Sequence, residues 1–348
     1  MAAGTGSAYR LRRGVAELHP GYFAMVMATG ILSTAAAELA QPLISISLLY
    51  LSAAAYIALL GLTCWRLLVF GDRVLSDCSR PDRAFAFFTF VAGSNVLGLR
   101  LLAAGQILAG EVLAAVAALV WVVLSYGIPT ALAASRSKTE FPQGINGTWL
   151  IWVVGTQSVA SSAASVAILH PAQAAILGFI AVATWGFAVV LYVLLMAIVV
   201  SRLLLVGLAP EQLTPAYWIT MGATAITVFA AARILSVPTE LPMARPVLAG
   251  LTMMLWAFGT WWIPLMVVLG IWRHLLRGVP LAYEPTLWSM VFPLGMYAAA
   301  SQAFGTIEHL RALQSIAGLE IWLGLVVWLA TFVGMLASWL HQGPLRPA

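Results

Sequence analysis

The chain has 348 residues, of which 62% are hydrophobic and only 8% charged, and its mean hydropathy is +0.97. A soluble domain carries about a quarter charged residues, so this composition excludes a soluble globular protein and indicates an integral membrane protein. The net charge of +5 is spread along the chain and forms no basic, aromatic-interleaved surface of the kind that binds nucleic acid. We therefore expect the lipid bilayer, and no nucleic acid, as a partner.

Ten segments are apolar over a length that can cross a bilayer, which takes about 20 residues. In chain order they cover residues 18–39, 43–70, 83–105, 109–135, 146–169, 172–205, 213–236, 246–275, 284–305 and 315–340. Their connections are too short for a soluble catalytic domain. The sequence therefore predicts an all-α fold with tails at residues 1–17 and 341–348 and one transmembrane domain at residues 18–340.

The basic residues predict the orientation of these ten spans. Thirteen Lys and Arg residues fall on the side of the N-terminus and four on the other side, the latter being Arg100, Arg233, Arg245 and Arg311. Basic residues are retained on the cytoplasmic side of a membrane. We therefore expect both termini in the cytoplasm and the protein in the cell's inner (plasma) membrane.

The odd-numbered spans repeat one pattern, in which an aromatic residue is followed within about two turns by a glycine among Ser, Thr or Asn. The anchor aromatics are 64, 62, 69 and 70 residues apart, namely Phe23, Phe87, Trp149, Trp218 and Trp288. Such a period indicates a repeated two-helix unit. It predicts five helical hairpins in a quasi-fivefold arrangement around a central pore.

Polar residues are concentrated in the odd spans, whereas the even spans are almost purely aliphatic. Polar side chains at membrane depth face the interior of a bundle or a water-filled cavity. We expect the pore to be lined by Phe23, Thr29, Gly30, Phe87, Ser94, Asn95, Gly155, Thr156, Gln157, Thr220, Gly222, Thr224 and Gly295. An alternative is that the small and polar residues only allow close helix packing.

Prolines lie at the start of three odd spans and in the middle of the ninth. Pro20, Pro215 and Pro285 stand where a missing N–H costs little, and Pro293 is expected to kink its helix. The anchors Trp149, Trp218 and Trp288 are expected at the membrane interface, where tryptophan is enriched.

Almost no charge lies deep in the spans. Arg100 and Arg233 come near the outer ends of the third and seventh spans, while Glu38 and Glu111 lie at the outer boundary. A neutral pore with arginines at its mouth suits a small inorganic or organic anion. Alternatively, both arginines extend to lipid headgroups or pair with Glu240 or Glu308.

No cofactor or metal is expected. The two cysteines, Cys64 and Cys78, lack the spacing of a metal site, and the five histidines occur singly. An intramembrane enzyme would need clustered His, Asp or Glu residues, or an activated serine, at membrane depth. The sequence offers no such cluster, and we expect no enzymatic activity.

Two segments resemble a known family. The first runs from His19 to Ser33 (HPGYFAMVMATGILS) and the second from Trp288 to Tyr297 (WSMVFPLGMY). Both are similar to signatures of the tellurite-resistance/dicarboxylate transporter family, which includes tellurite-resistance proteins, malate and sulfite transporters and plant slow anion channels. The resemblance implies five hairpins around a pore, commonly in a homotrimer. It also implies a gating phenylalanine on the ninth helix, which is Phe292 here, immediately before Pro293.

These observations support two functions. The first is a passive anion channel, or channel-like transporter, whose pore is occluded by Phe292. The second is a secondary transporter that exports sulfite or C4-dicarboxylates such as malate, with or without a coupled proton, and has a polar site around Asn95, Gln157 or Gln302. The sequence leaves the choice of anion open, because selectivity in a neutral pore depends on its diameter and on dehydration.

Overall fold

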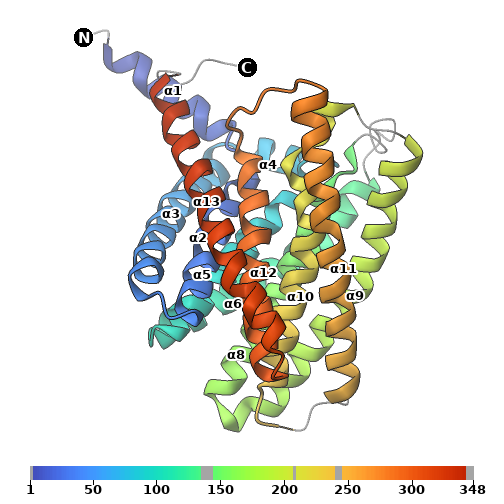
Figure 1. Cartoon of the computed structure of the whole chain (residues 1–348). Coiled ribbons are helices and arrows are strands. Elements are labelled where there is room, and N and C mark those ends of the chain that lie inside the picture. The colour runs from blue at the N-terminus through green and yellow to red at the C-terminus, as the bar shows by residue number, and fades with distance from the viewer. Residues whose placement is uncertain (1–2, 135–143, 207–208, 240–244, 342–348) are drawn as a thin grey trace.

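The computed structural model describes residues 3–134, 144–206, 209–239 and 245–341, and every regular element in these ranges is helical. The long helices stand side by side in one bundle (Figure 1). Their bounds are α1 Ala3–Ala16, α2 Ala24–Glu38, α3 Pro42–Val69, α4 Gly71–Cys78, α5 Phe88–Ala103, α6 Ile107–Ala134, α8 Ile151–Leu169, α9 Ala174–Ser201, α10 Ile219–Leu235, α11 Arg245–Ile271, α12 Trp288–Ile307 and α13 Arg311–His341.

Five helices, which we call the ring helices, form a closed circuit of contacts. α2 packs against α5, α5 against α8, α8 against α10, α10 against α12, and α12 against α2. Each ring helix also packs against the long helix that follows it in the chain, so that α3, α6, α9, α11 and α13 form a peripheral set. The alternation of odd and even spans is thus an alternation of ring and peripheral helices.

Burial separates the two sets. In the most apolar stretch of the ring spans α2, α5, α8 and α10, 78% to 89% of the residues are buried, against 11% to 33% in the five peripheral spans. Hydrocarbon accepts aliphatic side chains at no cost, whereas polar groups need protein partners. The aliphatic even spans therefore cover the polar odd spans.

Nine of the helices in the described ranges are long and apolar enough to cross a membrane. The ninth expected span, residues 284–305, coincides with α12, which is not among these nine helices. Ser289, Ser301 and Gln302 reduce its apolar character. Yet α12 has 20 residues and is largely buried in the ring.

Each ring helix begins with a short 3-10 turn that contains or adjoins its anchor aromatic. The turns are Pro20–Phe23, Ala84–Phe87, Gly147–Leu150, Pro215–Trp218 and Pro285–Leu287. The prolines expected at the start of three odd spans stand in the first two positions of these turns. The repeat in the sequence therefore marks the place where each ring helix starts, and we call this side of the bundle the start end.

The start end contains two further helices and buries two of the anchor tryptophans. The tail before the first span contains helix α1, and the charged segment after the second span contains helix α4. Trp149 and Trp288 are 7% and 1% exposed and thus buried in the protein, so neither belongs to an interfacial belt. The indole N–H of Trp149 donates to the carbonyl of Pro81 at 2.9 Å, which ties one ring helix to the segment before another.

Candidate functional site

A small cavity lies where all five ring helices meet. Its volume is about 10 Å³, roughly the room that a single water molecule needs. It is lined by Ile31 and Thr34 of α2, Val96 and Leu99 of α5, Ser158 and Ser161 of α8, Ile226 and Phe229 of α10, and Met296 of α12. Because every ring helix contributes, we call it the axial cavity. It is too small for a hydrated anion.

The hydroxyl groups of the axial cavity are occupied by their own helices. Thr34 Oγ1 donates to the Gly30 carbonyl at 3.2 Å, Ser158 Oγ to Gly155 at 2.6 Å and Ser161 Oγ to Gln157 at 2.9 Å. An anion in the cavity would accept a hydrogen bond only if one of these hydroxyls rotated away from its carbonyl. A typical intramolecular hydrogen bond contributes about 0.5–1.5 kcal/mol, so this exchange is within thermal reach.

Phe292 lies one helical turn from the axial cavity, towards the start end. It precedes Met296 by four residues on α12, so the two side chains project from the same face, and its own side chain is only 1% exposed. Pro293 follows inside the helix. The backbone of α10 passes close to this proline, because a Cβ added at Gly222 would lie 2.7 Å from Pro293 Cγ.

Several residues expected to line a pore lie at helix interfaces instead of at the axial cavity. The Asn95 amide donates to Ser158 Oγ at 2.9 Å and accepts from Ser162 Oγ at 2.8 Å, which joins α5 to α8. Thr156 Oγ1 accepts from the Trp121 indole at 2.9 Å. These side chains connect ring helices to each other or to the periphery.

The remaining hydroxyl and amide residues of this set have partners in neighbouring helices or in their own. Ser94 bonds to the Tyr56 hydroxyl, Thr29 accepts from the Trp328 indole, and Gln157 donates to the Trp185 carbonyl. Thr220 donates to the Tyr217 carbonyl in the turn before α10, and Thr224 donates to the Met221 carbonyl within α10. A pore-lining role for these residues stays a prediction.

The glycines of this set permit close approach between ring helices. A Cβ added at Gly30, Gly155 or Gly295 would lie 3.0 Å from Val96, Phe88 and Ile31 respectively. Such distances are tighter than ordinary van der Waals contact. The packing alternative considered from the sequence thus accounts for these positions.

Phe23 and Phe87 lie away from the ring axis. Both border a cavity of about 40 Å³ that is also lined by Leu59, Thr63 and Arg66 of the peripheral helix α3. The Phe23 ring packs edge-on against Tyr56 of α3, with ring centroids 5.8 Å apart. Phe23 also packs edge-on against Phe90 of the ring helix α5, with centroids 5.1 Å apart, and a place beside the pore stays a prediction for both residues.

The two arginines expected at the mouth have hydroxyl partners. Arg100 is 7% exposed, and its guanidinium donates to Ser33 Oγ at 3.1 Å and Ser45 Oγ at 2.8 Å. Arg233 Nε donates to Ser165 Oγ at 3.0 Å. The carboxylate of Glu308, considered as a partner for either, pairs instead with Arg245 at 2.8 Å. Glu240 lies outside the described residues.

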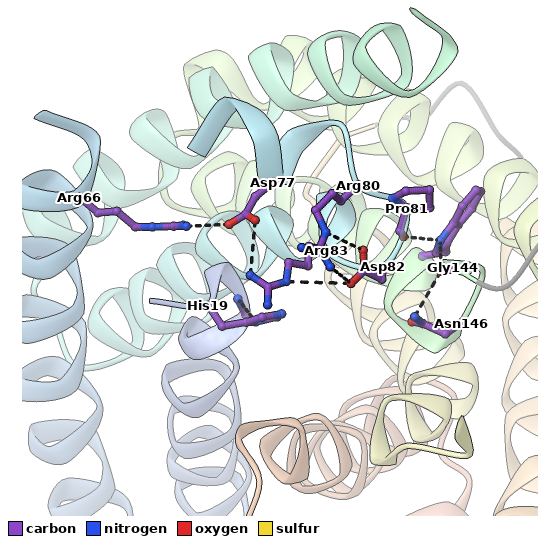
Figure 2. Close-up of polar contacts among 11 residues, drawn as sticks. His19, Arg66, Asp77, Arg80, Pro81, Asp82, Arg83, Gly144 and Asn146 are labelled. Atoms are coloured by element: carbon purple, nitrogen blue, oxygen red, sulfur yellow. Dashed lines mark hydrogen bonds and ion pairs between the residues drawn. The ribbon is translucent and has the colours of Figure 1, made fainter. Parts of the chain in front are cut away.

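At the start end, charged side chains form a compact network (Figure 2). Asp77 of α4 is 5% exposed and pairs with Arg66 at 2.6 Å and with Arg83 at 3.4 Å. Arg80 and Asp82 pair at 2.9 Å beside it. The network holds α4 against the end of α3 and the turn before α5.

His19 lies beside this network and caps the first ring helix. Its Nδ1 accepts a hydrogen bond from the Gly21 N–H at 3.0 Å, which requires the proton to sit on Nε2. Burial, and after it the nearby Arg83 guanidinium, lowers the pKa of His19 to about 4. The imidazole is therefore neutral at pH 7.

In the described part of the chain, no group of three or more His, Cys, Asp or Glu residues is placed to hold a metal ion.

The apolar half of the axial cavity is not apparent from the sequence, because residue polarity indicates only the hydroxyl-bearing half. The spacing from Phe292 to Met296 was the available signal, since residues four apart share a helix face.

The chain is similar to one protein family and to several individual proteins. Residues 17–336 match the family described as SLAC1, voltage-dependent anion channel. An uncharacterized membrane protein of Mycobacterium tuberculosis (strain H37Rv) is 50% identical over 149 residues, which are 42% of this chain and 75% of that protein. Two uncharacterized transporters of Methanocaldococcus jannaschii are 24% and 23% identical and cover 90% and 92% of this chain, and 91% and 94% of their own lengths.

Proposed function

This chain belongs to the voltage-dependent anion channel family, a transport family and not a family of enzymes, and we propose that it conducts small anions passively along the axis of its five ring helices. In this proposal Phe292 occludes the path, and the kink at Pro293 lets the ring move. The conducted species is a small inorganic or organic anion.

The axial cavity carries this proposal. All five ring helices contribute side chains to this cavity. Its continuation towards the start end passes Phe292, one turn from Met296 along the same helix face. A narrow cavity followed by a bulky apolar ring is the arrangement of a closed constriction.

An apolar constriction blocks ions because it loses water. An anion that enters must shed its hydration shell, and the lining offers no replacement. Moving the Phe292 ring off its preferred rotamer costs only about 0.5–1.5 kcal/mol. Moving the ring therefore costs less free energy than dehydrating the anion. A small displacement of one side chain can thus control conduction.

We also propose that ten spans stand in quasi-fivefold order, with α12 as the ninth. α1 and the last turns of α13 lie at the same end of the bundle (Figure 1), as an even number of spans requires. With the bias of basic residues, we place both termini, and the start end, in the cytoplasm and the protein in the plasma membrane. Residues 18–340 form the transmembrane domain, and a homotrimer follows by analogy alone.

The test is anion flux from liposomes that contain the purified protein. Phe292→Ala should raise nitrate or chloride flux several-fold, because it removes the apolar ring from the path. Phe304→Ala is the matched control, since Phe304 is also on α12 and also 1% exposed but projects from a different face. Equal flux in the two variants would sink the gate assignment.

Coupled transport of sulfite or C4-dicarboxylates is the second candidate, and the transporters of M. jannaschii favour it by their names. Two of the three amides considered for its polar site are engaged separately, since Asn95 bonds to α8 and Gln157 to α9, whereas the buried Oε1 of Gln302 has no hydrogen-bond partner among the described residues. Coupled transport requires flux that saturates with substrate and follows a pH gradient. Flux that rises linearly and ignores the gradient excludes it.

A further inference from the structure

Beyond the axial cavity, away from the start end, three side chains continue its lining. Glu38 follows Thr34 by four residues, Ser165 follows Ser161 by four, and Arg233 follows Phe229 by four. Residues at this spacing project from one helix face, and the three earlier residues all line the cavity. Glu38, Ser165 and Arg233 therefore form the next layer along the axis, which we call the charged layer.

The charged layer contains one acidic and one basic side chain, Glu38 and Arg233, on different helices. Ser165 Oγ accepts from Arg233 Nε at 3.0 Å. Glu38 and Arg233 interact electrostatically, yet no ion pair joins them among the described residues. Their helices, α2 and α10, are not neighbours in the ring, so the interaction crosses the axis.

Arg233 has more N–H donors than its hydrogen bond to Ser165 uses. A guanidinium carries five N–H groups, and in the described part of the chain the hydrogen bond of Arg233 uses Nε alone. Glu38 is an exposed residue at the end of α2. The two remaining nitrogens of Arg233 are available to an anion that enters the charged layer.

Other charged groups at this end have partners of their own. Arg100 on α5 donates to Ser33 and Ser45, Glu308 after α12 pairs with Arg245, and Glu111 on α6 pairs with His170. Glu320 on α13, His309 before α13 and Arg311 at its start exert no resolved electrostatic effect on Glu38 within the described residues. Among the described residues, Arg233 is the one charged group with a resolved electrostatic effect on Glu38.

We propose that Glu38 is a built-in counter-ion that competes with the permeating anion for the guanidinium of Arg233. An ionised Glu38 repels an arriving anion and weakens the attraction of Arg233, whereas a protonated Glu38 does neither. Anion flux therefore rises when protons reach Glu38 from the outer side. This inference rests on the proposed conduction of anions and adds a residue that sets its dependence on concentration and pH.

The experiment compares Glu38→Gln with Glu111→Gln in nitrate-loaded liposomes. Both variants remove a carboxylate at the same end of the bundle, but Glu111 belongs to the peripheral helix α6 and pairs with His170. Glu38→Gln should raise flux about threefold or more at low nitrate, as expected when a like charge is removed near a binding cation. It should also abolish the rise of flux on acidification, whereas Glu38→Asp should preserve it.

Equal flux and equal pH dependence in Glu38→Gln and Glu111→Gln would overturn the inference. A second readout separates it from the proposed function. Nitrate should raise the melting temperature of the purified protein, more in Glu38→Gln and less in Arg233→Gln. If the wild type conducts no anions, the proposed function fails, and the inference stands or falls on this nitrate-dependent stabilisation.

Discussion

Arg66 and Arg100 are two buried arginines at opposite ends of the bundle, and they are compensated in different ways. Arg66, at the start end, is 4% exposed and pairs with the Asp77 carboxylate at 2.6 Å. Arg100, at the far end, is 7% exposed and bonds only to the hydroxyls of Ser33 and Ser45 among the described residues. At the start end, a carboxylate neutralises the charge of Arg66. At the far end, Arg100 has only neutral hydrogen-bond partners among the described residues.

This difference separates a structural role from an electrostatic one. A buried ion pair ties elements together, but its two fields nearly cancel at a distance. A guanidinium with neutral partners keeps its field, and a low-dielectric surrounding strengthens that field. The start end is therefore built for attachment, whereas Arg100 keeps its field at the far end.

Breaking the compensated end should have the largest effect. Asp77→Asn removes the carboxylate that faces Arg66 and Arg83 and leaves a buried guanidinium without a counter-charge. Loss of one partner from a buried pair costs about 3–5 kcal/mol, which should appear as a marked fall in melting temperature in detergent. Asp72→Asn on the same helix is the control, since Asp72 is exposed. Similar melting temperatures for the two variants would contradict this account of the network.

His19 offers a smaller change at the same end, through pH. The unfolded histidine binds a proton below about pH 6.5, but the folded one only below a pKa of about 4. Between these values the unfolded state holds more protons, so stability falls as pH falls, by at most about 1.4 kcal/mol per pH unit.

The variant His19→Asn tests this pH dependence. Asparagine also accepts the capping hydrogen bond but does not titrate, so its unfolding free energy should change less between pH 6.5 and 4 than that of the wild type. Denaturant unfolding at several pH values measures the difference. An unchanged slope would show that another group dominates acid destabilisation.

The smallest change in stability is expected at the uncompensated end. Arg100→Met removes a buried charge without stranding a counter-ion, and Ser33 and Ser45 keep their hydrogen bonds to each other's carbonyls at 2.6 and 2.7 Å. The unfolding free energy should change by about 1 kcal/mol or less, or rise. Arg66→Met is the comparison, because it strands Asp77. A large loss in Arg100→Met would mean that the serine contacts stabilise the fold more than we infer.

The sequence was informative about the fold because a membrane separates residue types strictly. Hydrocarbon tolerates the aliphatic runs of α6 and α9 but not Asn95 or Thr156, so polarity alone divided ring from peripheral helices. The repeat of anchor aromatics then located the start of each ring helix. α1 and α4 were missed because they lie outside the apolar spans, where hydropathy carries no signal.

The site was less accessible to sequence because residue type does not reveal which face of a buried helix points inward. Asn95 and Thr156 were expected at the pore for their polarity, and the structure bonds Asn95 to Ser158, which lines the axial cavity, but Thr156 to Trp121 of a peripheral helix. Glu38 was set aside as a boundary residue. Its relation to Arg233 joins two residues more than 190 positions apart in the chain, which no local pattern encodes.

The closure of the ring also has a consequence for biosynthesis. α2 meets α12 and α13, and Thr29 accepts a hydrogen bond from Trp328, a residue 299 positions later. A ribosome delivers the first hairpin long before the last, so the inner face of α2 has no final neighbour until synthesis is nearly complete. Nascent chains that stop before α12 should therefore remain open at this seam, and they would be substrates for membrane quality control.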